Sequence, residues 1–409
     1  MNDLDEREVL ARELRDRSDD VAGTSIGLDA VKRTARRIQW RRRVAGGVVA
    51  AAVLAVAVPA GIAIDHDLTR SQGPVGRPSL DVNQTDHATP LPDGSFPLRM
   101  EGLVMGASPL VGYTHGNTLN APDGTSVEMP NPYSQVVRFG DGWLARDTNT
   151  ANHTAVYLDR QGGQQPRHDI GYGFALGVDG SVGYVAVGRS GPSTLVHHPL
   201  DGPEQPLRTV PSGLDVAPVG YLAPDSVVYQ LDDPNAGRPP EVRVASLSGP
   251  DRALTGVERA SAVSQAAGLV AGVTSFDSST GQSCVGVVEP ATGQSRLWQS
   301  CDHVLSDFSP DGQYVAALGN LDSPEGQPTV SILDARTGDT VVEYRQAKDS
   351  RALVTEVAWE DDGHLLAVAH DGLTWRILRL DTEGNLETAT DPAVAADPIQ
   401  EPYHLLVRP

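Results

Sequence analysis

Turn signals recur along most of this chain at a nearly constant spacing, and this repetition restricts the fold more than any other feature. One series of turn glycines recurs at intervals of 38 to 47 residues: Gly124, Gly162, Gly202, Gly249, Gly293, Gly338 and Gly384. A second series lies 20 to 26 residues before the members of the first: Gly102, Gly142, Gly180, Asp225, Gly268, Gly312 and Gly363. Two turns in each period, with short β-rich runs between them, indicate units of four strands.

The clearest unit shows how the residues produce this pattern. Residues 308–316 read F-S-P-D-G-Q-Y-V-A, and after the apolar run 330–333 the turn 334–338 reads D-A-R-T-G. Asp-Gly supplies the positive φ of a tight hairpin, and short apolar runs suit strands buried between sheets. Seven units of this kind predict an all-β chain folded as a seven-bladed β-propeller over residues 98–409.

The two strings resemble the repeats of TolB-like and WD40-like β-propellers. The resemblance is clear over residues 286–384 and looser before about residue 260, and 359–363 (W-E-D-D-G) is a degenerate copy of the first string. True WD40 repeats are not expected, because no Trp-Asp dipeptide occurs. The resemblance implies the fold and no functional residue, since these motifs are structural.

The end of the chain is predicted to close the ring. Residues 403–407 form an apolar run after a Pro-containing stretch, and we expect it to pair with the region of Phe96. A blade would then be shared between the two ends of the repeat region, which leaves eight blades open as an alternative.

Residues 44–64 are predicted to form a transmembrane helix. The stretch has no charged residue, and 21 helical residues at 1.5 Å each span the roughly 30 Å hydrocarbon core. Seven basic residues and no acid lie between 32 and 43, whereas Asp65 and Asp67 follow the stretch, so the N-terminus is expected in the cytoplasm. A cleaved signal peptide remains the alternative.

The two flanks of this segment have different compositions. Residues 1–43 are expected to form a cytoplasmic head of two short helices, which resembles the heads of actinobacterial single-pass proteins, some of them anti-sigma factors. The His/Cys zinc motif of that group is missing, because the first histidine is His66. The scarcity of lysine also resembles actinobacterial proteins. Residues 65–97 contain five prolines and are expected to form an extended extracytoplasmic linker.

The net charge of −21 lies almost entirely beyond the apolar stretch. Residues 1–43 carry 11 basic and 9 acidic side chains, whereas residues 65–409 carry 21 basic and 44 acidic ones. So acidic a domain repels phosphates, and a nucleic-acid partner is therefore not expected.

Cys284 and Cys301 lie at equal distances from the turn at residues 292 and 293, so they should face each other across a hairpin. Opposed cross-strand residues have Cβ atoms about 4.5 to 5.5 Å apart, which is close to disulfide range, and an exported domain permits oxidation. We expect a disulfide. A bulge at the turn would shift the register and leave two thiols as the alternative.

No pattern for catalysis, a metal or a cofactor emerges from the sequence. The candidates are histidines without ligand-like spacing, namely His197, His198, His303, His364 and His370, and acid pairs in turns, namely Asp232-Asp233 and Asp361-Asp362. The zinc-protease, EF-hand and P-loop motifs are absent. A carboxylate pair from different blades could still meet at the central channel.

Three functions follow from these observations. The first is a membrane-tethered, extracytoplasmic, non-catalytic module that binds a protein or ligand through its loops. The second is an extracytoplasmic enzyme with a site at the channel, which requires carboxylates or histidines within a few ångströms of one another. The third is transmembrane signalling, in which the head contacts a cytoplasmic regulator such as a sigma factor. Fold alone selects none of them.

Overall fold

The computed structural model describes residues 89–406, except for 134, 147–153, 170–172, 188–190, 237–238, 278, 292–293, 320–324, 373 and 396–400. The secondary structure of this part consists of strands, which belong to seven separate sheets. We name each sheet a blade and number the blades in chain order.

Blades 1 to 4 each contain four strands. In order from the first strand of each sheet, blade 1 contains β30 (Tyr403–Leu405), β2 (Tyr113–His115), β3 (Thr118–Asn120) and β4 (Ser126–Glu128), and blade 2 contains β5 (Gln135–Phe139), β6 (Gly142–Arg146), β7 (Thr154–Leu158) and β8 (Gln164–Asp169). Blade 3 contains β9 (Ala175–Leu176), β10 (Val182–Ala186), β11 (Ser193–His198) and β12 (Gln205–Val210). Blade 4 contains β13 (Asp215–Ala223), β14 (Ser226–Asp232), β15 (Glu241–Ser246) and β16 (Arg252–Ala253).

Blades 5 to 7 repeat this order, and blades 6 and 7 carry an extra strand. Blade 5 contains β17 (Arg259–Ser264), β18 (Leu269–Asp277), β19 (Gln282–Glu289) and β20 (Gln294–Ser300). Blade 6 contains β21 (His303–Phe308), β22 (Tyr314–Gly319), β23 (Thr329–Asp334) and β24 (Thr340–Gln346), with β1 (Phe96–Leu98) beside β24. Blade 7 contains β25 (Leu353–Trp359), β26 (His364–His370), β27 (Thr374–Asp381) and β28 (Leu386–Thr388), with β29 (Ala393–Val394) beside β27.

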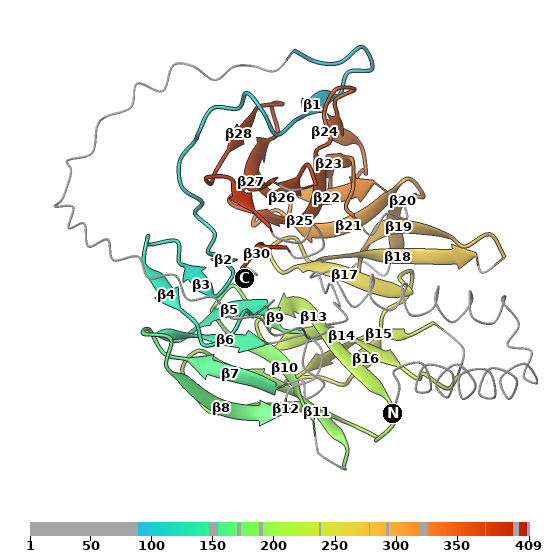
Figure 1. Ribbon diagram of the computed structural model, residues 1–409. Coiled ribbons are helices and arrows are strands. Elements are labelled where there is room, and N and C mark those ends of the chain that lie inside the picture. Colours follow the sequence, from blue (N-terminus) through green and yellow to red (C-terminus); the bar gives the residue numbers. More distant parts are fainter. Residues whose placement is uncertain are drawn as a thin grey trace, which may run out of the picture. The chain divides into compact units, whose positions relative to one another are not determined.

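The blades follow one another around a ring (Figure 1). Their first strands contact one another in succession, β13 with β17, β17 with β21, β21 with β25, and β25 with β30. Six hydrophobic clusters fill the spaces between neighbouring blades. This arrangement is a seven-bladed β-propeller, as the turn spacing predicts.

Burial on both faces explains why the strands read as short apolar runs. In β26, Leu366 and Val368 join the cluster shared with blade 1, whereas Leu365 and Ala367 join the cluster shared with blade 6. Successive side chains along a strand therefore pack against the two neighbouring blades in turn, so a strand needs apolar residues on both faces of the sheet.

The C-terminal strand closes the ring by supplying the first strand of blade 1. β30 pairs antiparallel with β2, with Tyr113 opposite Leu405 and His115 opposite Tyr403. The expected pairing of this strand with the Phe96 region is wrong, because Phe96 lies in β1, which pairs in parallel with β24. One blade is thus shared between the ends of the repeat region, and the count is seven.

Most of the predicted turns join the strands as expected. Gly124, Gly162 and Gly338 lie between the third and fourth strands of their blades, and Gly180 and Gly312 between the first and second. All five have a positive φ, which a glycine adopts without strain. Gly102 is an exception. It precedes β2 without joining two strands of blade 1, because the first strand of that blade comes from the other end of the chain.

The predicted head, transmembrane helix and most of the predicted linker, residues 1–88, lie outside the described residues. Within the described residues there is no helix with the length and hydropathy needed to cross a bilayer. The paired backbone starts with β1 at Phe96, within the last residues of the segment predicted as a linker.

Candidate functional site

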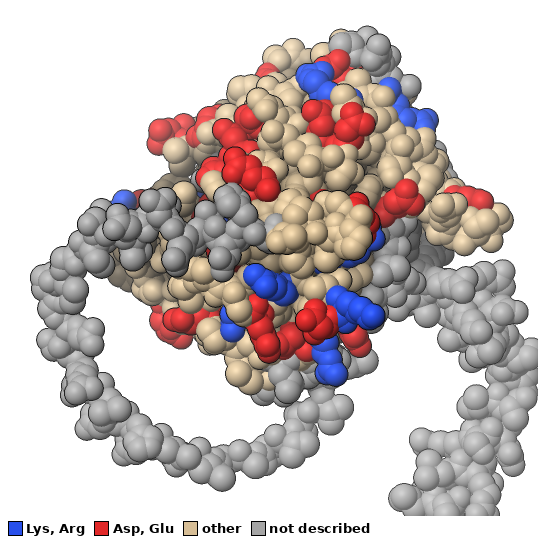
Figure 2. All heavy atoms as spheres, turned by 90° about the horizontal axis from the view of Figure 1, so that it is seen from above, with Lys and Arg blue, Asp and Glu red and all other residues tan. Residues whose placement is uncertain are grey.

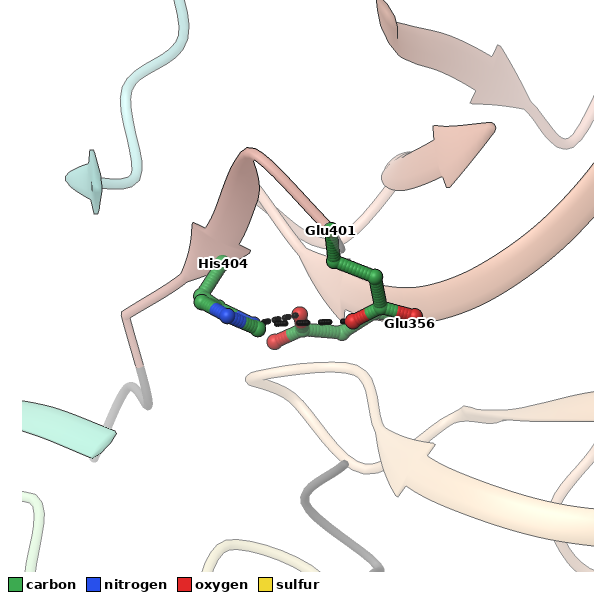
Figure 3. A group of neighbouring side chains, drawn as sticks. All are labelled: Glu356, Glu401 and His404. Carbon is green, nitrogen blue, oxygen red and sulfur yellow. Dashed lines mark ion pairs between the residues drawn. The ribbon is translucent and has the colours of Figure 1, made fainter. Parts of the chain in front are cut away.

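Glu356, Glu401 and His404 meet where blade 7 adjoins the closing strand. Glu356 lies on β25, His404 on β30, and Glu401 three residues before His404 (Figure 3). The Nδ1 atom of His404 is 3.5 Å from Oε2 of Glu356 and 3.7 Å from Oε2 of Glu401. One ligand-type atom from each residue lies within 4.8 Å of the other two.

Local backbone features direct Glu356 toward the closing strand. β25 has a bulge between Val354 and Glu356 in its pairing with β26, and a bulge re-aims the side chains that follow it. The backbone N–H of Leu405 on β30 donates a hydrogen bond to Oε1 of Glu356, at 3.1 Å. This contact joins the inner strands of blades 7 and 1 and leaves Oε2 of Glu356 facing His404.

The three side chains are only partly exposed, and their charged groups have too few partners. The exposed fraction of the side chain is 10% for Glu356, 9% for Glu401 and 21% for His404. Oε2 of each glutamate and Nδ1 of the histidine lie buried without a hydrogen-bond partner. Removing charged groups from water is costly unless they are paired, so two carboxylates facing a single imidazole are poorly compensated.

The titration of the group reflects this shortage. Burial raises the pKa of Glu401 to about 7, and the nearby Glu356 carboxylate adds to the increase while His404 opposes it. Burial alone would lower the pKa of His404, but Glu356 and Glu401 outweigh it and the pKa is raised. A largely buried carboxyl group with a strongly raised pKa often marks a functional site.

Glu401 also borders a cavity of about 1730 Å³. Its described lining comes from the segment before β2, from the β22–β23 and β24–β25 loops and from the β26–β27 turn. Basic and acidic groups are mixed on its walls: Arg99, Lys348 and Arg351 with Glu101, Glu325, Asp349 and Asp371. The cavity therefore joins blades 6 and 7 and leads to the buried carboxylate.

His370 forms part of the cavity wall and has a structural role there. Its ring stacks on Trp375 with a centroid separation of 4.4 Å. Gly372 N–H donates to Nδ1 at 3.1 Å, so Nε2 carries the proton that it donates to the carbonyl oxygen of Glu325 at 2.5 Å. With both ring nitrogens engaged, His370 fixes the β26–β27 turn.

The other histidines predicted from the sequence are not part of this group: His197 and His198 lie in blade 3, His303 in blade 6 and His364 at the start of β26 in blade 7. Nδ1 of His197 contacts the Tyr221 hydroxyl at 2.8 Å, and the ring of His198 lies 4.6 Å from that of Phe139. His303 begins β21. His364 pairs with Asp361 within one turn, at 2.9 Å.

The acid pairs also lie in separate places. Oδ1 of Asp362 accepts a hydrogen bond from the backbone N–H of Asp311 at 3.0 Å, and Oδ1 of Asp361 accepts those of Gly363 and His364. Asp232 ends β14, and Asp233 follows in the loop, where its Oδ1 accepts the N–H of Asn235. The structure does not bring the two pairs together.

Sequence reasoning missed Glu356, Glu401 and His404. The spacing Glu401-x-x-His404 beside the predicted closing strand was the available signal. Glu356 had none, because its proximity to His404 depends on ring closure. A carboxylate pair from different blades at the central channel was considered only in general terms, and it named neither Glu356, in blade 7, nor Glu401, in the segment that leads into the closing strand.

Cys284 and Cys301 form a disulfide in the structure, with their Cα atoms 4.0 Å apart. The hairpin of β19 and β20 does contain a register shift, between Val287 and Glu289. Val285 is nevertheless opposite Ser300, which places the two cysteines opposite each other in the next position.

Acidic and basic side chains are interspersed on the side of the molecule shown in Figure 2, where acidic residues gather in several groups with basic residues among them. A surface of this kind does not offer nucleic-acid phosphates a continuous basic track on that face.

No protein-family model matches the chain, and no curated protein matches it either. Similar solved structures include a Synechocystis apocarotenoid oxygenase mutant, which is 13% identical over 64% of this chain and 74% of the other, with a TM-score of 0.41. A prolyl endopeptidase is 13% identical over 71% of this chain and 50% of the other, with a TM-score of 0.45. Hsv2 from Kluyveromyces lactis is 12% identical over 68% and 92%, with a TM-score of 0.43. At these values the similarities carry no argument about function.

Proposed function

We propose that this chain is a non-catalytic binding module whose propeller holds a segment of a partner protein in the cavity of blades 6 and 7. The cavity itself is the observation that carries the proposal. At about 1730 Å³ it exceeds the roughly 300 to 1,000 Å³ typical of small-molecule sites, and loops from two blades border it. Its mixed charges suit the side chains of a peptide better than a ligand of one sign.

The proposal includes a tether. Residues 44–64 hold the propeller outside the cytoplasm, with residues 1–43 inside; the support is the charge difference across the apolar stretch and a disulfide suited to an oxidising compartment. Protease added to intact, wall-stripped cells should degrade the propeller and spare an epitope fused to the N-terminus. Degradation of the epitope alone would contradict the tether.

Site-specific photo-crosslinking tests the cavity. A photoreactive amino acid at exposed Asp349, on the cavity rim, should link the protein to one discrete partner in its native cells. The double charge reversal Lys348→Glu and Arg351→Glu should reduce that product at least about tenfold, because complementary charges guide binding at such surfaces.

The matched control reverses two exposed charges in other blades, Arg252→Glu and Arg296→Glu, which changes the net charge equally. It should leave the cross-linked product unchanged. Equal loss in both double variants, or no discrete product at all, would contradict the cavity as a binding surface.

A second candidate function is an extracytoplasmic enzyme, and the Glu356, Glu401 and His404 group favours it. Two carboxylates and an imidazole within a few ångströms are the arrangement that the enzyme hypothesis requires. The candidates separate by His404→Gln, because His404 is not among the residues that line the cavity. This change should leave cross-linking at Asp349 intact if the protein only binds, and should abolish hydrolysis of a generic peptide, ester or phosphate substrate if it is an enzyme.

A further inference from the structure

We propose that Glu356, Glu401 and His404 bind a divalent transition-metal ion of the Zn²⁺ class at the junction of blade 7 and the closing strand. The proposal is independent of partner binding in the cavity. Its three ligands would be one carboxylate oxygen from each glutamate and Nδ1 of the histidine. The ion would connect β25 with β30 and so reinforce the closure of the ring.

The distances between the ligand atoms fit such an ion. In a tetrahedral zinc site with ligands at about 2.1 Å, neighbouring ligand atoms are about 3.4 Å apart. The two distances from His404 Nδ1, 3.5 Å to Glu356 Oε2 and 3.7 Å to Glu401 Oε2, are close to this value. One ligand-type atom from each of the three residues lies within 4.8 Å of the other two, which leaves both carboxylates within reach of a single ion.

Burial gives an independent reason to expect a cation. The Glu401 side chain is only 9% exposed, and its Oε2 is buried and unpartnered like Oε2 of Glu356 and Nδ1 of His404. A protonated imidazole neutralises one carboxylate and leaves the other uncompensated. A divalent ion bound with a neutral imidazole would neutralise both carboxylates and would coordinate all three atoms that lack a hydrogen-bond partner.

The mixture of ligands selects the class of metal. Ca²⁺ and Mg²⁺ prefer sites made wholly of oxygen atoms, usually six or more, whereas imidazole nitrogen with carboxylates suits zinc and its neighbours. Glu401 borders the large cavity, so water can enter from that side and take the fourth position.

The test uses the full-length protein in a mild detergent, stripped of metal with EDTA. Adding ZnCl₂ at about a hundredfold excess over Kd should raise the Tm by about 5 °C. Glu401→Gln and His404→Gln should lose that shift. The control Glu383→Gln removes an exposed carboxylate of the β27–β28 turn and should keep it.

The metal-free protein provides the sharper comparison. Without metal, Glu401→Gln removes an uncompensated buried charge and should keep or raise the Tm, although the same variant loses the gain from Zn²⁺. A residue with only a packing role would not show opposite effects in the two conditions. Co²⁺ in place of Zn²⁺ should give visible absorption bands in the wild type and none in the His404→Gln variant.

Three results would overturn the proposal. The first is no shift with Zn²⁺, Mn²⁺ or Co²⁺. The second is an equal shift in the wild type and in the Glu401→Gln and His404→Gln variants, which would indicate adventitious binding elsewhere. The third is a larger shift with CaCl₂ than with ZnCl₂, which would contradict the class of metal. None of these results bears on cross-linking at Asp349, so the proposed function is tested separately.

Discussion

Asp307 shows how one side chain in a first strand can make stability depend on pH. It lies on β21, beside Phe308, whose backbone N–H donates a hydrogen bond to Oδ1 at 2.8 Å. Burial raises its pKa from 3.8 to about 6, and this hydrogen bond only partly opposes the increase. The folded protein therefore favours the protonated carboxyl more than the unfolded chain does.

We predict that Asp307→Asn stabilises the protein at about pH 8 and has little effect at about pH 4. A raised carboxyl pKa gives stability that is present below the unfolded pKa and is lost as the pH rises to about 6. The difference between a pKa of 3.8 and one of about 6 corresponds to at most about 3 kcal/mol, and the asparagine can still accept the Phe308 N–H. Urea unfolding at the two pH values measures the difference. An equal effect at both would contradict the assignment.

The disulfide carries a second prediction at this scale. Cys284 and Cys301 close a loop with a sequence separation of 17 residues, for which chain entropy predicts a stabilisation of about 3 kcal/mol. The Cys284→Ser and Cys301→Ser double variant should lose about that much in urea unfolding, and dithiothreitol should lower the wild type to the same level. A variant that dithiothreitol still destabilises, or a wild type without a cross-linked peptide in non-reducing mass spectrometry, would contradict the pairing.

The sequence predicted single residues where their partners are local. Cys284 was paired with Cys301 because a hairpin places its residues symmetrically about the turn. The register shift between Val287 and Glu289 lies between the turn and the cysteines, and it brings them opposite each other, because the Glu289–Gln294 pair alone would place Cys284 opposite Gln299. Glu356 could not be assigned to His404 in the same way. Only the path of the chain around the whole ring brings these two strands together.

At the scale of elements, the turn between the first and second strands of blade 6 also packs against the neighbouring blade. Gly312 joins β21 to β22 with φ of +73°, and a Cβ there would lie 2.5 Å from Ala267 Cβ and Ser264 Oγ of blade 5. Gly268 has the same position in blade 5, with φ of +66°, and a Cβ there would meet nothing within 4 Å. The two glycines have nearly the same backbone conformation, but only Gly312 lies against a neighbouring blade.

Gly312→Ala should therefore destabilise the protein more than Gly268→Ala. Both variants place an alanine at positive φ, which costs about 1 to 2 kcal/mol. Gly312→Ala adds overpacking, typically about 1 to 3 kcal/mol. Urea unfolding of the two variants measures the difference. If they lose equal stability, the contact between the blades at this turn is not as described.

A degenerate repeat shows what the turn pattern leaves out. Glu360 stands in blade 7 where Ser309 stands in blade 6, and it is buried with Arg379. Arg379 donates to both carboxylate oxygens of Glu360, and Leu110 N–H donates to Oε1 at 2.5 Å. The sequence identified the degenerate copy. The sequence could not show that Glu360, in the place of the serine, binds the backbone of the segment before β2.

For the molecule as a whole, the repeat spacing was sufficient to predict seven units of four strands, because each hairpin is local. The repeat spacing was not sufficient to predict which strands pair at the two ends of the repeat region. Gly102 was interpreted as a turn within blade 1, and the closing strand was assigned to Phe96. Both errors have one cause: β30 takes the first position of blade 1 and leaves β1 to extend blade 6. The apolar run at the end of the chain and the spacing of the turns do not show whether the closing strand pairs with β2 or with the Phe96 region.

Ring closure by β30 is the central claim, since it defines the propeller and creates the Glu356, Glu401 and His404 group. The direct measurement is calorimetric unfolding of a chain ending at residue 402 beside one ending at residue 406. Tyr403 and Leu405 are each 4% exposed, so losing β30 should cost at least about 4 kcal/mol and broaden or abolish the transition, and a peptide of residues 400–409 should partly restore it. The chain ending at residue 406 should unfold as the full-length protein does. An unchanged Tm for the chain ending at residue 402 would contradict the closure.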